Sequence, residues 1–174
     1  MSDASPPYDL EAFLARHVPI TRAMGLRLGE YGPGGIVLTA PLAPNVNDKG
    51  IAFGGSIASL MSLAGWALTD FILREDGVEG AEVVIARTSI EFLRPVVGPI
   101  EARCARPSAA EVSRLLAAWR SRARARWDLE CTVEGEGGRG ALAHARYVVR
   151  PRAIALAETE RPSRAGRMQG RRLR

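Results

Sequence analysis

The stretch that decides the fold runs from residue 44 to residue 73: P-N-V-N-D-K-G-I-A-F-G-G-S-I-A-S-L-M-S-L-A-G-W-A-L-T-D-F-I-L. It opens with a polar, turn-forming segment, after which Phe53, Gly54 and Gly55 lead into a long apolar run. Ser56 or Gly55 is suited to cap the helix that follows. Because the first turn of a helix presents unpaired N–H groups and a partial positive charge, this junction is predicted to stabilise negative charge on a ligand.

The apolar run itself has no charged side chain from residue 50 to residue 69. A run of about 20 apolar residues can span a bilayer, which is one alternative. Glycines and serines dilute this run, however, and nothing else in the chain resembles a membrane protein. A helix that is apolar on all sides is more often a buried core helix, so we expect a central helix over residues 55–74 and no membrane partner.

Length and charge predict a single domain with a terminal extension. A chain of 174 residues fits one domain with one core. The net charge of +5 belongs to residues 151–174, which hold seven arginines and two glutamates, whereas charges balance over residues 1–150. We therefore expect a disordered N-terminus over 1–8, a domain over 9–150 and an arginine-rich disordered tail over 151–174. This weakens a nucleic-acid function and leaves an acidic partner protein open for the tail.

The cysteines and the N-terminus indicate a cytoplasmic protein. The first eight residues lack the charged and apolar segments of a signal peptide. Cys104 and Cys131 fit a reducing compartment, and their spacing matches no metal motif, so we expect no metal site. We interpret both cysteines as small apolar strand residues, and His17 and His144 as structural or solvent-facing.

Alternation of apolar and polar residues predicts an α+β fold with an antiparallel sheet. The expected helices are 9–17, with Asp9 as its N-cap, and 109–119, besides the central one. The expected strands are 24–31, 35–42, 82–93, 98–106, 122–134 and 141–149. In strand 82–93, we expect Val84, Ala86, Thr88, Ile90 and Phe92 to share one face. A single long helix that is apolar on most faces requires a strongly curved sheet to wrap it.

The motif N-x-x-G-x-x-F-G-G, at Asn47, Gly50, Phe53, Gly54 and Gly55, resembles the hotdog fold of the thioesterase superfamily. The longer string A-P-L-A-P-N-V-N-D-K-G-I-A-F-G-G-S from residue 40, with L-A-G-W at 63–66, resembles more narrowly the YiiD C-terminal domain family. Some members of that family are similar to the malonyl-ACP decarboxylase MadB. The resemblance covers roughly residues 9–150.

This resemblance implies a curved antiparallel sheet around the central helix, and homodimers or homotetramers with sites between subunits. It implies substrates that are thioesters of coenzyme A or acyl carrier protein, with no cofactor beyond the phosphopantetheine that the substrate carries. The thioester carbonyl of such proteins lies over the N-terminus of the central helix. By position, the N–H of Gly55 is the oxyanion donor, and Gly54 gives room for the approach.

The sequence also departs from the hydrolytic members of the superfamily. Phe53 stands where many have a histidine, Ser62 where many have an acidic residue, and Asn47 where others have an aspartate. Asp48 is the nearest carboxylate, but its neighbour Lys49 indicates a solvated turn pair. Hydrolysis needs a general base or a nucleophile, which these neutral residues do not supply.

Decarboxylation of a malonyl thioester needs no base, so it is the favoured reaction, with thioester hydrolysis second and a non-catalytic thioester-binding domain third. We expect Gly55 N–H to bind the thioester oxygen and Asn45 or Asn47 to position the malonyl group. Phe53, Gly54, Ser56, Asp48 and Ser62 are expected to contact the substrate. Arg87, Arg94 and the arginines between 120 and 126 are candidates to meet the phosphates of coenzyme A or an acidic carrier protein, although a solvated strand face explains most of them.

Overall fold

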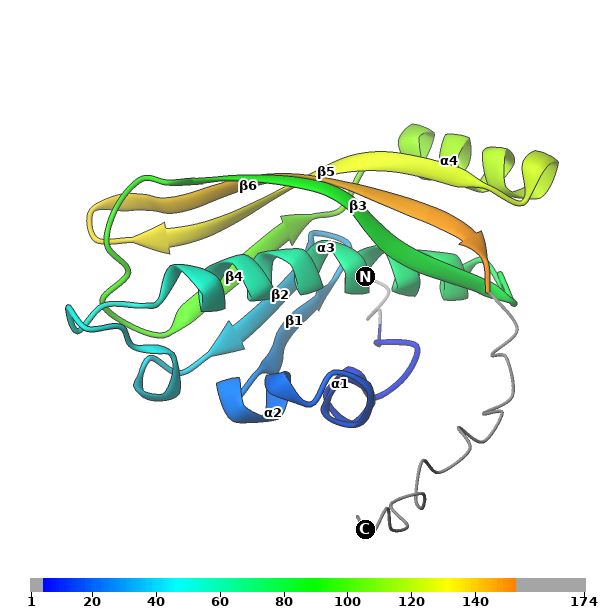
Figure 1. The fold of residues 1–174 in the computed structure, drawn as a ribbon. Helices are drawn as coiled ribbons and strands as arrows, with labels where there is room; N and C mark the ends of the chain where they lie inside the picture. Colours follow the sequence, from blue (N-terminus) through cyan, green and yellow to red (C-terminus); the bar gives the residue numbers. More distant parts are fainter. Residues whose placement is uncertain (1–4, 153–174) are drawn as a thin grey trace, which may run out of the picture.

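One long helix, α3 (Gly54–Glu75), lies in the concave face of a single curved sheet in the computed structural model, which describes residues 5–152 (Figure 1). The predictions of disorder for residues 1–4 and for the tail beyond residue 152 fall outside the described residues. By length and composition α3 could cross a membrane, but 67% of its most apolar window is buried in the protein. The sheet therefore supplies the apolar environment that this helix needs.

The sheet has six antiparallel strands in the order β1-β2-β4-β5-β6-β3. Their bounds are β1 Arg27–Gly32, β2 Gly35–Ala40, β3 Ala81–Phe92, β4 Ile100–Ala105, β5 Ala125–Gly135 and β6 Gly138–Pro151. This confirms the predicted curved antiparallel sheet around one central helix. In this order β3, which follows α3 in the chain, forms one edge of the sheet and pairs with β6.

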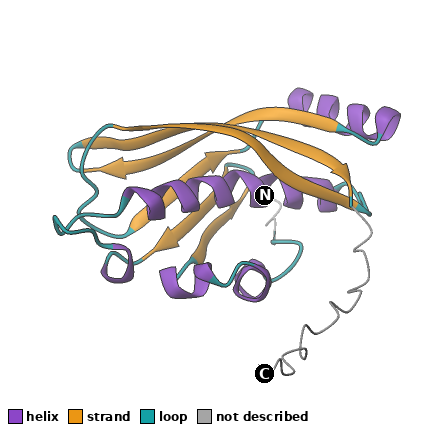
Figure 2. Ribbon diagram, viewed as in Figure 1, coloured by secondary structure: helices purple, strands orange, loops and turns teal. Residues whose placement is uncertain are grey.

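Shorter helices cover the remaining surfaces (Figure 2). α1 (Leu10–His17) and α2 (Ile20–Met24) lie on the open side of α3, and η1 (Ala43–Asn45) follows β2. α4 (Ala109–Arg122) packs against β5 from outside the curve of the sheet. Two N-caps follow the sequence: Asp9 accepts a hydrogen bond from Ala12 N–H, and Ser108 forms a capping box with Glu111. The prediction for α3 is wrong, because Phe53, and not Gly55 or Ser56, is its N-cap.

The core lies between α3 and the sheet, and Gly65 fixes how closely the two approach. A Cβ at Gly65 would lie 2.4 Å from the Tyr147 hydroxyl oxygen. Tyr147 is fully buried on β6 and donates a hydrogen bond to the Ser62 carbonyl oxygen. The glycine of the L-A-G-W string thus leaves room for an aromatic ring that spans the gap between helix and sheet.

The first strand begins at Arg27, not at residue 24, because Met24 is the last residue of α2 and Gly25 is left-handed with a φ of 67°. Two further strand predictions are wrong in detail. β3 contains a bulge between Ile85 and Arg87, so Val83 rather than Val84 shares the inner face with Thr88, Ile90 and Phe92. An extra residue in one strand reverses the alternation beyond it, which a pattern of period two does not reveal.

The second error concerns the start of β5. α4 continues to Arg122, and Ala123 ends it in the left-handed conformation with φ 49°. The strand therefore begins at Ala125, not at residue 122. From Ala125 onward the predicted faces are confirmed, because Leu129, Cys131 and Val133 are buried while the charged residues between them are exposed.

Candidate functional site

The N-terminal tip of α3 presents two unpaired backbone donors, the N–H groups of Gly54 and Gly55. The N–H groups of Ser56 and Ile57 both donate to the Phe53 carbonyl oxygen, at 2.9 and 3.1 Å. The N–H groups of Gly54 and Gly55 have no acceptor within the described part of the chain, and the N-cap residue provides no side-chain hydrogen bond. A 22-residue helix that begins this way offers unsatisfied donors and the positive end of its dipole to a ligand.

A cleft of about 340 Å³ opens at this tip. It is lined by Asn47, Ile51, Ala52, Gly54, Ile57, Phe92, Leu93, Arg94, Pro95 and Val96. The Phe92 ring lies so close to Gly54 that a Cβ there would already touch it, at 3.4 Å. The lining is thus mainly apolar, with one amide, one guanidinium and the helix tip as its polar elements.

Asn45 does not face this cleft, contrary to the sequence-based expectation. Its side chain is 2% exposed, and its amide nitrogen donates to the carbonyl oxygens of Met24 (2.8 Å) and Pro41 (2.7 Å). Its backbone carbonyl accepts from Phe53 N–H at 2.7 Å. Asn45 therefore fastens the loop before α3 to the end of α2, because these buried carbonyl oxygens need a donor.

Asn47 lines the cleft and also shapes the loop beside it. Its side-chain oxygen accepts hydrogen bonds from the N–H groups of Lys49 (2.8 Å) and Ile51 (3.4 Å). Gly50 completes this turn with a φ of 76°. The amide nitrogen of Asn47 donates to no residue within 5–152, so it is available to a ligand. The turn-forming and ligand-facing interpretations of this residue are compatible.

Phe53 and Gly55 are neighbours on the outer side of the tip. The Phe53 side chain is 55% exposed, and its ring lies against Gly55, where a Cβ would be 2.3 Å from a ring carbon. Gly54, rather than Gly55, lines the cleft. Each glycine therefore leaves room for one aromatic ring: the Phe92 ring packs against Gly54, and the Phe53 ring packs against Gly55.

The remaining predicted contacts lie farther from the cleft. Ser56 is buried at 9% exposure, and Ser62 is half-buried one turn beyond Ser59 on α3. Asp48 is exposed and pairs with Lys49 at 3.0 Å, as the sequence indicated. None of these three residues lines the cleft.

Residues 92–96 form one wall of the cleft, which the sequence did not predict. The N–H groups of Leu93 and Arg94 donate to the Gly140 carbonyl oxygen, and Ala52 N–H donates to the Val96 carbonyl oxygen. These contacts bring the end of β3 beside the loop before α3. Arg94 is one of the arginines that the sequence offers for contact with phosphates, but its place in this wall was not predicted, because local patterns do not report contacts across some 40 residues.

The cleft lining contains no histidine, cysteine, aspartate or glutamate among the described residues. The two cysteines lie elsewhere, opposite each other on β4 and β5 and buried. A hydrogen bond with Cys131 and burial raise the pKa of the Cys104 thiol, which disfavours a nucleophilic thiolate. The site can therefore bind and polarise a carbonyl oxygen, but it holds no evident base.

A curved antiparallel sheet wrapped around one long helix defines a protein of the hotdog class. Residues 8–151 match the family described as "Putative thioesterase (yiiD_Cterm)", and the chain belongs to this family. It is similar to a protein of unknown function from Chlorobaculum tepidum, with 28% identity over 82% of this chain and 93% of that one and a TM-score of 0.78. It is also similar to a "putative thioesterase" from Shewanella oneidensis, with 28% identity over 82% and 95% of the two chains and a TM-score of 0.73.

Proposed function

We propose that this protein decarboxylates a malonyl thioester, with malonyl-ACP as its substrate and acetyl-ACP as its product. The observation that carries the proposal is a cleft at the tip of α3 whose described lining offers backbone and amide donors but no general base. Family membership supports the thioester part of this proposal. The absence of a base in the lining favours decarboxylation over hydrolysis.

In the proposed reaction the bond between the malonyl carboxylate and the methylene carbon breaks. Carbon dioxide leaves, and the electron pair delocalises into the thioester carbonyl as an enolate, which then takes a proton from water to give the acetyl thioester. The N–H group of Gly54, which lines the cleft, binds the carbonyl oxygen as its negative charge develops. A donor positioned in this way contributes about 3 kcal/mol to the transition state.

Asn47 positions the substrate in this scheme, since its amide nitrogen is unpaired while its oxygen is held by the loop. The apolar walls formed by Ile57, Phe92 and Val96 surround the departing carboxylate. An apolar setting favours dispersal of the carboxylate charge into neutral carbon dioxide and an enolate that the helix tip stabilises. Asn45 acts on the site only by holding the loop.

Thioester hydrolysis is the second candidate, and the family description favours it. It would require Asp48, or a residue of a second subunit, to activate water. Asp48 is exposed and paired with Lys49, so it would have to reorient toward the cleft.

We also propose that the protein is a homodimer joined through β3. This strand of 12 residues is at the edge of the sheet, and edges with unpaired backbone groups bind further strands. Large apolar side chains are exposed along this side: Phe53 at 55%, Ile85 at 43%, Phe92 at 55%, Leu93 at 50% and Val97 at 53%. Association along β3 would cover these side chains and enclose the cleft.

Product identification tests the proposed reaction. The purified protein is incubated with malonyl and butyryl thioesters of both coenzyme A and acyl carrier protein, and intact thioesters and free thiol are quantified by mass spectrometry and a thiol reagent. Decarboxylation predicts acetyl thioester from the malonyl substrates without release of thiol. Free malonate with an equal amount of thiol would instead establish hydrolysis, and binding without any product would establish a thioester-binding protein.

A further inference from the structure

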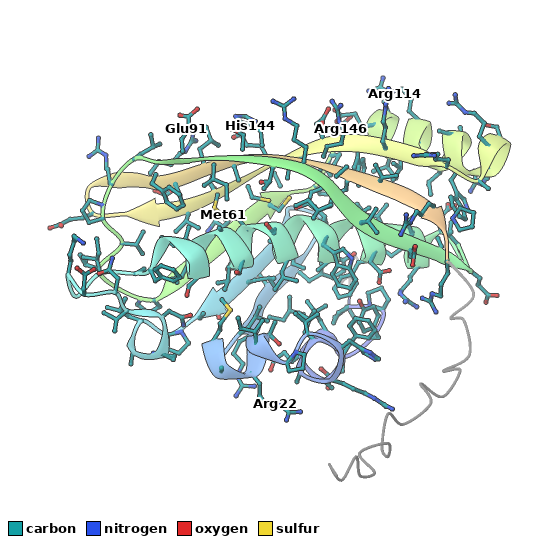
Figure 3. All side chains as sticks on the ribbon, in the orientation of Figure 1. Arg22, Met61, Glu91, Arg114, His144 and Arg146 are labelled. Carbon is teal, nitrogen blue, oxygen red and sulfur yellow. The ribbon has the colours of Figure 1, made fainter. Side chains whose placement is uncertain are left out.

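A second cleft, of about 610 Å³, lies between α4 and the convex face of the sheet. We call it the arginine cleft, and it is lined by Ala86, Ala118, Arg122, Arg124, Ala125, Arg126, Arg146 and Val148. Figure 3 shows Arg146 on the convex face, on the side of the sheet away from Arg22 of α2. The sheet therefore separates the arginine cleft from α3 of the same subunit.

The floor of the arginine cleft is apolar because small residues meet there. Ala86 is the bulged residue of β3, Ala118 comes from α4, and Val148 is half-buried on β6. Arg126 is the register partner of Val148 on β5, so its side chain stands beside this floor. An apolar floor with cationic walls suits a partner that presents both apolar and acidic side chains.

The positive charge of the arginine cleft is largely uncompensated. Arg146 forms a two-bond pair with Asp128, with both nitrogen–oxygen distances at 2.8 Å. Arg122, Arg124 and Arg126 have no carboxylate oxygen within 4.0 Å among the described residues. Arg87, the register partner of Arg146 on β3, adds a further positive charge to this face.

The pKa of Asp128 reflects the same excess of positive charge. The hydrogen bond from Arg146 lowers its pKa most, and the charges of Arg126 and Arg87 lower it further. One carboxylate is thus surrounded by three guanidinium groups.

The described chain ends away from the arginine cleft, because Arg152 lies beside Asp70, Arg74 and Gly80 near the C-terminal end of α3. β6 ends at Pro151, three residues beyond Val148, and residues 152–174 carry seven arginines against two glutamates. The excess positive charge at the arginine cleft comes from Arg122, Arg124 and Arg126, although charges over residues 1–150 sum to zero. Such a region raises the association rate of an acidic partner.

We propose that the arginine cleft is a docking surface for an acidic, amphipathic helix of a partner protein. A protein fits better than a small phosphate, because the three unpaired arginines are exposed and spread over α4, β5 and the link between them. No buried polar side chain is among the residues that line the arginine cleft. The choice of an acyl carrier protein as this partner rests on the proposed function, since the carrier would deliver the thioester. Docking by itself does not depend on the reaction.

The test measures binding of the carrier protein without an acyl group, by titration calorimetry at low salt. Arg122→Glu with Arg126→Glu is compared with Arg16→Glu and Arg22→Glu, which make the same charge change on exposed positions of α1 and α2. We expect the first pair to weaken binding at least tenfold and the control pair less than twofold. A milder pair, Arg122→Gln with Arg126→Gln, is the control for misfolding of the glutamate variants. Melting temperatures equal to that of the wild type show that the variants are folded.

A second measurement compares carrier-bound with coenzyme A-bound malonyl substrate. The cleft variants should lower kcat/KM for the carrier substrate at least tenfold relative to the coenzyme A substrate. Equal weakening by both variant pairs, no weakening by either, or equal loss on both substrates would overturn the docking proposal. Stronger binding of duplex DNA than of carrier protein, lost in the cleft variants, would overturn it as well. If neither substrate turns over, the binding titration still decides on docking, while the proposed reaction fails.

Discussion

At the scale of single residues, the loop before α3 separates structural from ligand-facing amides. Asn45 and Asn47 are two positions apart and look equivalent in the sequence. Asn45 donates to two buried carbonyl oxygens, whereas Asn47 keeps its amide nitrogen unpaired at the cleft. The sequence predicted the glycine-flanked helix tip correctly, because that depends on local conformation. It did not distinguish the asparagines, because the partners of Asn45 are the carbonyl oxygens of Met24 and Pro41, which the local pattern does not reveal.

Replacing Asn47 with aspartate separates its two contributions. Asn47→Asp keeps an oxygen for the Lys49 N–H but removes the donor that faces the cleft. Loss of one positioned donor should lower kcat for decarboxylation by about 100-fold. The rate of acetyl-thioester formation checks this, and a melting temperature close to that of the wild type shows that the turn persists. Unchanged activity would show that Asn47 has only a structural role.

Gly65 is predicted to be required for stability. A methyl group at this position would lie 2.4 to 2.7 Å from three atoms of Tyr147. Gly65→Ala should therefore cost about 1 to 3 kcal/mol of unfolding free energy through overpacking. Denaturant titration measures the loss, with Gly98→Ala as the control because a Cβ at Gly98 meets no atom within 4 Å. Equal stabilities of the two variants would contradict the tight packing of α3 against β6.

At the scale of elements, the sequence predicted the order of the strands and of the helices α1, α3 and α4, but it missed the short helices α2 and η1 and the irregularities within the strands. Alternation identified β5 from Ala125 onward because one face is buried and the other is solvated. The bulge at residue 86 and the left-handed Ala123 escaped prediction, since neither position carries a glycine or proline signal. The half-buried α4 was expected to end at 119 because the apolar period fades before its arginine-rich last turn.

A cluster of three side chains joins β1, the end of α3 and the segment after β4, and it predicts an acid sensitivity. Glu75 accepts hydrogen bonds from Tyr31 and Arg106. Burial alone would raise the pKa of Glu75, but the bonds from Arg106 and Tyr31 outweigh it and hold the pKa below the ordinary 4.5. Burial and the bond to Glu75 raise the pKa of Tyr31 to about 12, so Tyr31 stays a donor at neutral pH.

A group whose pKa is lowered on folding adds stability above its unfolded pKa and loses it as pH falls. Glu75→Gln should therefore reduce the unfolding free energy by about 1 kcal/mol at neutral pH, given the partial exposure of the cluster. The difference between wild type and variant should shrink as pH falls below 4.5. Urea titrations across this range measure it, and a difference that is independent of pH would refute the role of the Glu75 charge.

At the scale of the whole molecule, the exposed edge strand and its apolar side chains predict association. Ile85 of β3 is 43% exposed and lies away from the cleft lining. Ile85→Glu should convert the dimer to monomers by placing charges in the interface, with at least a tenfold weaker association. Ile20→Glu is the matched control, because Ile20 on α2 is 62% exposed. Sedimentation velocity distinguishes the species, and a wild-type monomer at micromolar concentration would contradict the proposed dimer.

The proposed reaction depends on hydrogen-bond donors at the tip of α3 and not on a general base. The pH dependence of kcat for acetyl-thioester formation tests this most directly. Without a titrating base in the cleft, kcat of the wild type should stay constant within about twofold from about pH 5 to pH 8. A tenfold fall in kcat for each unit decrease in pH, with the titration of a single group, would show that a deprotonated base takes part and would contradict the account.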